Sequence, residues 1–211
     1  MNTKLILLLL TFCFTFTFSQ KKELYVNEDL KLISKTEFEN ETHNSVSSNF
    51  RFELDTCFLN VKVLKHKKGT IEMSLLDSIK KNFSKTNSQK INDTDILLIN
   101  YYPGNDKCST TSYKENFKKR HNQVNKKMNK IENLKQLFIY KSNENIKDFG
   151  EKINWQQDFN KLIETIFFPI DYPCGGYIII DNKGNYMIER GEYCYSDLLI
   201  EQIQNFITSN N

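Results

Sequence analysis

The chain has 211 residues and a formal net charge of +3 at pH 7, with 29 Lys and Arg against 26 Asp and Glu. A charge this close to neutral, with no basic stripe interleaved with aromatic residues, excludes the electrostatic footprint of a typical nucleic-acid-binding protein. The length suffices for a globular domain with a sizeable core, and seven Gly and three Pro exclude a collagen-like chain.

The first residues have the layout of a secretory signal peptide. Lys4 supplies a positive start, residues 5–18 form an apolar run, and the small residue Ser19 precedes Gln20. The run is shorter than the roughly 20 apolar residues of a membrane-spanning helix. We therefore expect residues 1–19 to be removed, which lowers the net charge from +3 to +2 by the loss of Lys4. The mature chain is then exported, periplasmic or extracellular, without a membrane span.

Residues 20–95 show a mixed pattern that predicts an N-terminal α+β extension. Strand-like alternation covers 24–33 and 50–63, residues 36–49 are polar, and 65–70 (KHKKGT) predicts a turn. An apolar residue recurs at helical spacing over 72–83, which predicts an amphipathic helix. We expect this extension to pack on the main domain or to form a small separate lobe.

From residue 96 onward, strands and helices alternate. The predicted strands cover 96–101, 135–140, 177–180 and 185–190, with a hairpin turn at 181–184. The predicted helices cover 112–132 and 197–207, and a helical or irregular segment lies between the second and third strands. The order β-α-β-α-β-β-α predicts an α/β domain over residues 96–211. Its parallel strands are joined by right-handed crossovers, and its terminal hairpin forms an antiparallel edge.

Cys108 lies where the first of these strands, ILLINYY, gives way through PGNDKC to the first helix. Thr110, Thr111 and Ser112 are all suitable N-cap residues, and Glu115 follows Ser112 at capping-box spacing. A thiol at a helix N-terminus faces unpaired N–H groups and the positive end of the helix dipole, which both stabilise the thiolate. The junction therefore predicts a nucleophilic Cys108.

This order of elements, with a cysteine at the first strand–helix junction, resembles the thioredoxin-like superfamily, in particular its exported bacterial thiol–disulfide branch. The resemblance covers residues 96–211 and is carried by ILLINYYPGNDKC and CGGYIIIDNKGNYMIERGE. The second stretch is similar to the family's region where a cis-proline precedes a strand, an Asp-x-x-Gly turn and a returning strand. The family's active site is Cys-x-x-Cys. Here Thr111 stands at the second cysteine, Lys107 at the usual Trp, and Gly175 where the cis-proline would fall.

The resemblance implies that the start of the helix and the loop before the third strand lie side by side, with Cys108 within bridging distance of Cys174. Cys108 would attack a disulfide of a protein client and Cys174 would be the resolving thiol, with no cofactor. The hairpin turn allows another pairing, because it places Cys174 roughly opposite Gly191, near Cys194.

The mature chain retains four cysteines, which allow three connectivities. They are Cys57, Cys108, Cys174 and Cys194. Structural staples, redox exchange and metal binding are the alternatives, and metal binding has the least support because no C-x-x-C is present and the histidines are scattered. His121 is expected on the polar, solvated side of its helix. The two functional hypotheses are an exported thiol–disulfide exchange protein and a non-catalytic thioredoxin-fold binding or scaffold protein with structural disulfides.

Overall fold

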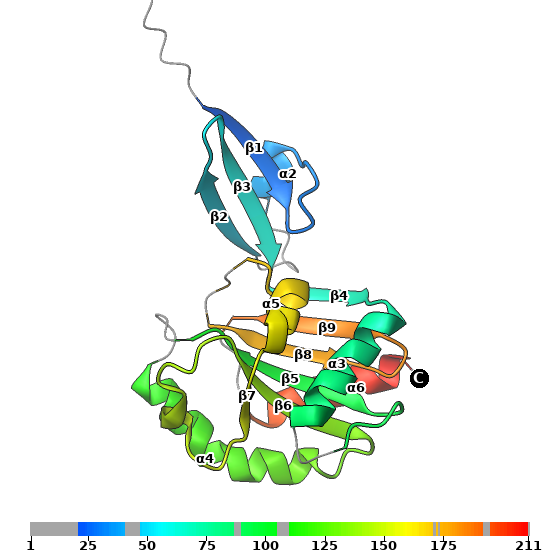
Figure 1. Ribbon diagram of the computed structural model, residues 1–211. Coiled ribbons are helices and arrows are strands. Elements are labelled where there is room, and N and C mark those ends of the chain that lie inside the picture. Colours follow the sequence, from blue (N-terminus) through cyan, green and yellow to red (C-terminus); the bar gives the residue numbers. More distant parts are fainter. Residues whose placement is uncertain are drawn as a thin grey trace, which may run out of the picture. The chain divides into compact units, whose positions relative to one another are not determined.

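A computed structural model describes residues 21–40, 47–86, 90–104, 110–170, 172, 174–191 and 195–210 (Figure 1). The signal peptide expected at residues 1–19, Cys108 and Cys194 lie outside these residues. The chain divides into two compact units. Of the described residues, the first unit contains 21–40 and 49–63, and the second contains 47, 48 and everything from Leu64 onward.

The first unit is a three-stranded sheet of order β1-β3-β2, with β1 parallel to β3. Its strands are β1 (Lys22–Asn27), β2 (Ser47–Glu53) and β3 (Cys57–Leu64). A short helix, α2 (Lys35–Glu39), starts where the Ser34 side chain accepts the N–H of Glu37. The single run expected at 50–63 is therefore divided between two strands, and the polar residues 36–49 contain most of α2 and the start of β2.

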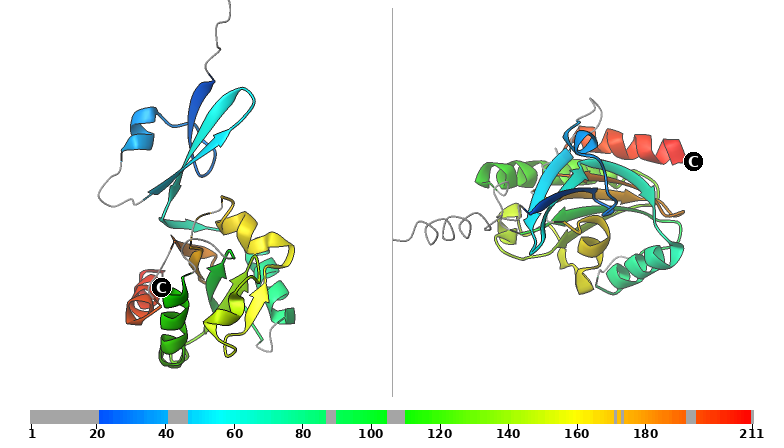
Figure 2. Two further views of the ribbon diagram at one scale, coloured as in Figure 1. Left: turned by 90° about the vertical axis from the view of Figure 1, so that its left-hand side faces the viewer. Right: turned by 90° about the horizontal axis from the view of Figure 1, so that it is seen from above.

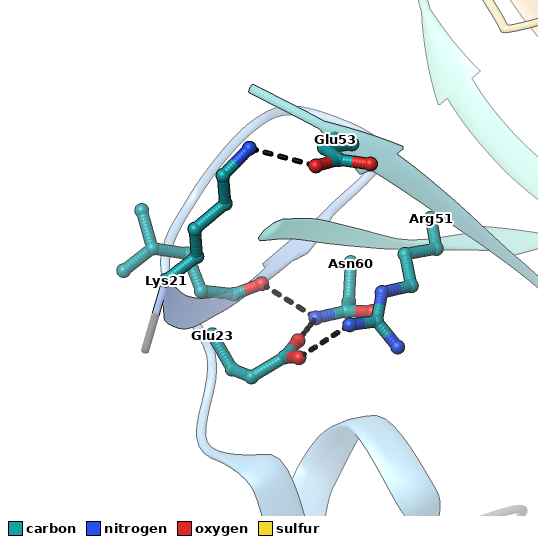
Figure 3. Close-up of polar contacts among 6 residues, drawn as sticks. Lys21, Glu23, Arg51, Glu53 and Asn60 are labelled. Atoms are coloured by element: carbon teal, nitrogen blue, oxygen red, sulfur yellow. Dashed lines mark hydrogen bonds and ion pairs between the residues drawn. The ribbon is translucent and has the colours of Figure 1, made fainter. Parts of the chain in front are cut away.

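A polar network ties the three strands of this sheet together (Figure 3). Arg51 on β2 donates to Glu23 on β1 at 2.7 Å, and Asn60 on β3 donates to the other Glu23 oxygen at 2.5 Å. Lys21 pairs with Glu53 at 2.7 Å. Exposed pairs of this kind each contribute at most about 1 kcal/mol, so the network chiefly fixes how the strands are aligned.

The second unit is built on a six-stranded sheet of order β4-β9-β8-β5-β6-β7. The strands are β4 (His66–Thr70), β5 (Ile96–Tyr102), β6 (Leu134–Tyr140), β7 (Trp155–Gln157), β8 (Gly176–Ile180) and β9 (Asn185–Arg190). β5 and β7 run parallel to β6, whereas the β5–β8, β8–β9 and β4–β9 pairs are antiparallel. The central strands β5 and β8 are buried over nearly all their length, which explains their continuous apolar sequences.

Helices cover both faces of the large sheet (Figure 2). They are α3 (Met73–Thr86), α4 (Thr111–Met128), α5 (Leu162–Phe167) and α6 (Asp197–Asn210), with short 3₁₀ helices η1 (Ile146–Phe149) and η2 (Phe159–Lys161). α3 and α5 pack on one face, where Ile178 and Ile180 of β8 point. α4 and α6 pack on the other, with Tyr177 and Ile179. This two-sided core confirms the predicted α/β class.

The prediction of a turn at residues 65–70 was wrong, because residues 66–70 form β4. β4 pairs with β9 from His66↔Glu189 to Thr70↔Asn185, so the β8–β9 hairpin is not the edge of the sheet. The amphipathic helix predicted at 72–83 is α3, and its apolar side packs into the core of the second unit. β4 and α3 both belong to the second unit, which includes everything described from Leu64 onward.

The helix after β5 begins at one of its three suggested caps. Thr110 is the N-cap, and its Oγ1 accepts the N–H of Tyr113 at 3.2 Å. Ser112 lies inside the helix, so the predicted Ser112–Glu115 capping box does not form. Within the described residues, none of the helices is both long and apolar enough to cross a bilayer.

Candidate functional site

Cys174 lies in the turn that leads into β8 and is disulfide-bonded. Its φ is +73°, and Gly175 and Gly176 follow with φ of +65° and +154°. Cys57, the other cysteine in the described part of the chain, is a buried free thiol and is not its partner. The two expected partners, Cys108 and Cys194, lie outside the described residues, so the choice between them stays a prediction.

The turn after Cys174 packs directly on the carboxyl end of β5. A Cβ on Gly175 would lie 2.2 Å from the carbonyl oxygen of Tyr101 and 2.7 Å from Cδ of Pro103. Only glycine fits there, because the left-handed backbone and the close approach both exclude a side chain. Since β5 leads through this point to α4, the Cys174 turn lies beside the start of the β5–α4 connection. The carboxyl ends of parallel strands are where α/β sheets usually bind ligands.

A buried carboxylate with two basic neighbours lies on β9, the strand that pairs with β8 after this turn. Glu189 on β9 has only 6% of its surface exposed, and its Oε2 contacts Nδ1 of His66. Lys65 Nζ lies 3.4 Å from the other oxygen. Burial raises the pKa of Glu189, although His66 and Lys65 oppose the shift. The half-exposed imidazole of His66 is thereby held against a carboxylate, as in a proton-transfer pair.

Gly191, two residues after Glu189, contacts the Cys174 turn through its backbone. Gly191 donates its N–H to the carbonyl of Gly175 at 2.8 Å. A Cβ on Gly191 would lie 3.3 Å from the ring of Tyr172 and 3.7 Å from Cε of Lys65. The side chains of Lys65 and Tyr172 therefore both lie close to Gly191, just after the end of β9.

The Arg190 side chain follows Glu189 on β9 and lies on the opposite face of the sheet. Its guanidinium is buried and donates to the carbonyl of Phe167 at 3.0 and 3.1 Å and to that of Leu64 at 2.7 Å. These bonds tie the end of α5 and the chain entering β4 to β9. Arg190, Glu189 and His66 have no local sequence signal that marks them as candidate site residues.

The prediction that His121 is solvated was wrong, because only 6% of its surface is exposed. Its ring stacks with Phe117 and Tyr195, at centroid distances of 6.2 and 5.9 Å. The helical spacing of Phe117, His121, Val124 and Met128 puts all four on the buried side of α4. That spacing is a sequence signal for a buried position at His121, whereas the polar character of histidine favoured a solvated one. Burial lowers the pKa of His121.

The described residues contain no group of three or more His, Cys, Asp and Glu side chains arranged to hold a metal ion. The described residues offer a disulfide-bonded cysteine on a glycine turn at the start of β8, and an imidazole–carboxylate contact on the neighbouring strands β4 and β9. Comparison with protein-family models, with curated proteins and with solved structures finds no match for this chain.

Proposed function

We propose that the protein is an exported thioredoxin-like thiol–disulfide exchange protein, in which Cys108 is the attacking thiol and Cys174 the resolving thiol. The observation that carries the proposal is the disulfide-bonded Cys174 in a turn packed on the carboxyl end of β5. The connection from β5 to α4, which contains Cys108 in the sequence, starts at that contact.

The strand order supports the thioredoxin-like part of the proposal. Four strands lie in the order β6-β5-β8-β9, with the first pair parallel and the others antiparallel. α4 and α6 cover one face and α5 the other. This is the arrangement that the order β-α-β-α-β-β-α implies for a thioredoxin-like domain, with β4 and β7 added at the two edges.

The proposed exchange is a balanced transfer of one disulfide. The Cys108 thiolate attacks one sulfur of a client disulfide, forms a mixed disulfide and releases the other client sulfur as a thiolate. Cys174 then attacks the Cys108 sulfur, which releases the second client thiolate and leaves a Cys108–Cys174 disulfide. Two electrons pass to the client, and the reverse sequence oxidises a client dithiol. The relative reduction potentials of protein and client decide the direction.

A non-catalytic binding or scaffold protein is the second candidate. It is favoured by the tight packing around the Cys174 turn, which is typical of a permanent structural disulfide. It is also favoured by four large apolar side chains exposed in the first unit, namely Leu30, Leu32, Phe52 and Leu54. Exposed apolar side chains of this size are candidates for contacts with a protein partner.

Redox titration of the mature protein, with mass spectrometry of the paired cysteines, separates the two candidates. We expect a Cys108–Cys174 bond that forms and breaks between about −120 and −270 mV, the range of catalytic dithiols. A Cys108–Cys174 bond with a reduction potential below about −300 mV would contradict the exchange function. A Cys174–Cys194 bond in its place would also contradict it. Cys57→Ser is the matched control, because Cys57 is a free thiol and its replacement should leave the potential unchanged.

A further inference from the structure

Two clefts open on either side of His121 in the second unit. One has a volume of about 620 Å³ and lies between α4, β6 and the segment before β7. The other has a volume of about 650 Å³ and lies between α4, η1 and the same segment. His121 and Lys152 line both clefts, so they form the wall between them. Each volume is in the range of small-molecule sites.

Positive charge is concentrated around these clefts. Six lysines line them against two glutamates, Glu132 and Glu151; the lysines are Lys118, Lys119, Lys130, Lys135, Lys147 and Lys152. Formally the lining therefore carries +4 before any contribution from His121, while the whole chain carries only +3. The excess is local, and it favours a negatively charged occupant.

His121 contributes a fixed polar group to the wall between the clefts. The Tyr195 hydroxyl lies 3.5 Å from Nδ1 of His121 and accepts a hydrogen bond from Gln136 Nε2 at 2.9 Å. The hydroxyl has one proton, which it can donate either to Nδ1 or to Gln136 Oε1 at 3.3 Å. Donation to Nδ1 puts the proton of a neutral ring on Nε2, which is then a hydrogen-bond donor. The stacked rings of Phe117 and Tyr195 hold the imidazole in one plane. A pre-organised donor beside a lysine suits an anionic oxygen.

We propose that the clefts around His121 bind a small organic anion, through phosphate or carboxylate groups that His121 and Lys152 hold together. The surrounding lysines contact the remaining anionic groups, and Gln136 and the asparagines of the first cleft, Asn125 and Asn129 among them, contact neutral polar atoms. This site uses none of the cysteines, so it does not depend on thiol exchange.

Intrinsic fluorescence offers a direct test, because Trp155 is the only tryptophan of the chain. Its ring lies 5.3 Å from that of Phe138, which lines the first cleft, and 5.4 Å from that of Phe149, which lines the second. Pyrophosphate and citrate are titrated separately into the mature protein at constant ionic strength set with NaCl. We expect a saturable fluorescence change with a dissociation constant below about 1 mM for at least one of the two anions.

The variants decide whether the response comes from this site. Lys152→Glu changes an exposed side chain and should weaken binding at least about tenfold by placing a negative charge in the shared wall. His121→Gln should also weaken binding, with circular dichroism used to verify its fold. Lys126→Ala is the matched control, because Lys126 is exposed on α4 but lines neither cleft, and it should bind like the wild type.

Three outcomes would overturn the proposal. They are the absence of saturation by both anions, an equal loss of binding in Lys126→Ala, and unchanged binding in Lys152→Glu. Saturation by pyrophosphate but not by citrate would identify a phosphate site, and the reverse a carboxylate site.

Discussion

Gly191 donates its backbone N–H to the carbonyl oxygen of Gly175 across 2.8 Å, and this bond joins the end of β9 to the turn that carries Cys174. On its other side the same turn touches the Tyr101 carbonyl of β5. Cys174 is therefore held between two strands by backbone contacts. Its position depends on glycine geometry more than on side-chain packing.

Gly175→Ala should destabilise the protein by at least about 2 kcal/mol, because the new Cβ would meet a backbone oxygen and the left-handed conformation is strained for alanine. Urea unfolding followed by circular dichroism measures this loss as a lower midpoint. Gly150→Ala is the matched control. Its φ is also positive, at +106°, but its Cβ would meet only the flexible Lys118 side chain at 3.3 Å. An equal loss in both variants would show that the contact with β5 is unimportant.

The local sequence pattern was sufficient to predict the strands that are buried on both faces and the helices that are strongly amphipathic. β5 and β8 are almost entirely apolar because both sides of these strands are covered, and α3 has a regular apolar stripe. β4 was missed because HKKGT has no apolar side to recognise, and its pairing with β9 depends on backbone hydrogen bonds to a distant segment. The three-residue strand β7 is too short to show a period.

The partners of elements and side chains were harder to predict than the elements themselves. The apolar stripe of α3 is compatible with any apolar surface, so the sequence could not indicate that this helix belongs with the large sheet. His66 and Glu189 are far apart in the chain and meet only because β4 and β9 pair in one register. Cys174 was predicted as a site residue through the thioredoxin resemblance, whereas its imidazole–carboxylate neighbour has no local sequence signal.

Thr110→Ala should lower the free energy of unfolding by about 1 kcal/mol, because α4 then loses the side-chain acceptor for the Tyr113 N–H. Ser112→Ala is the control that distinguishes this cap from the capping box suggested by the sequence. Ser112 is exposed inside the helix, so its replacement should change stability by less than about 0.5 kcal/mol. Chemical denaturation of both variants provides the comparison. A larger loss in Ser112→Ala than in Thr110→Ala would mean that the capping box forms.

Glu189→Gln should change how stability depends on pH. The folded protein raises the Glu189 pKa above its ordinary 4.5, so the folded state holds this proton more tightly than the unfolded state. That contribution to stability is complete below about pH 4.5 and is lost as the pH rises through the folded pKa. Glutamine has no proton to lose, so the stability of the variant relative to wild type should increase from pH 4 to pH 7.

The groups that face Glu189 define the control for this experiment. They are His66 from β4, Lys65 just before β4, and Tyr177 from β8. His66 contacts Glu189 directly, so the pH series is repeated in a His66→Asn background, where the sign of the Glu189→Gln effect should persist. A relative stability that falls with rising pH would mean that ion pairing outweighs desolvation at Glu189.

Asp181→Ala should cost about 2–3 kcal/mol, because the buried carboxylate organises the β8–β9 turn. Its Oδ1 accepts the backbone N–H groups of Lys183 at 2.9 Å and Asn185 at 2.8 Å, and its Oδ2 accepts from the Asn185 side chain at 2.7 Å. Asp181→Asn keeps one acceptor oxygen for the two backbone groups and loses only the side-chain bond, so it should cost less than half as much. Urea midpoints at pH 7 give the comparison. Equal losses in the two variants would show that the negative charge, and not the backbone hydrogen bonding, stabilises the turn.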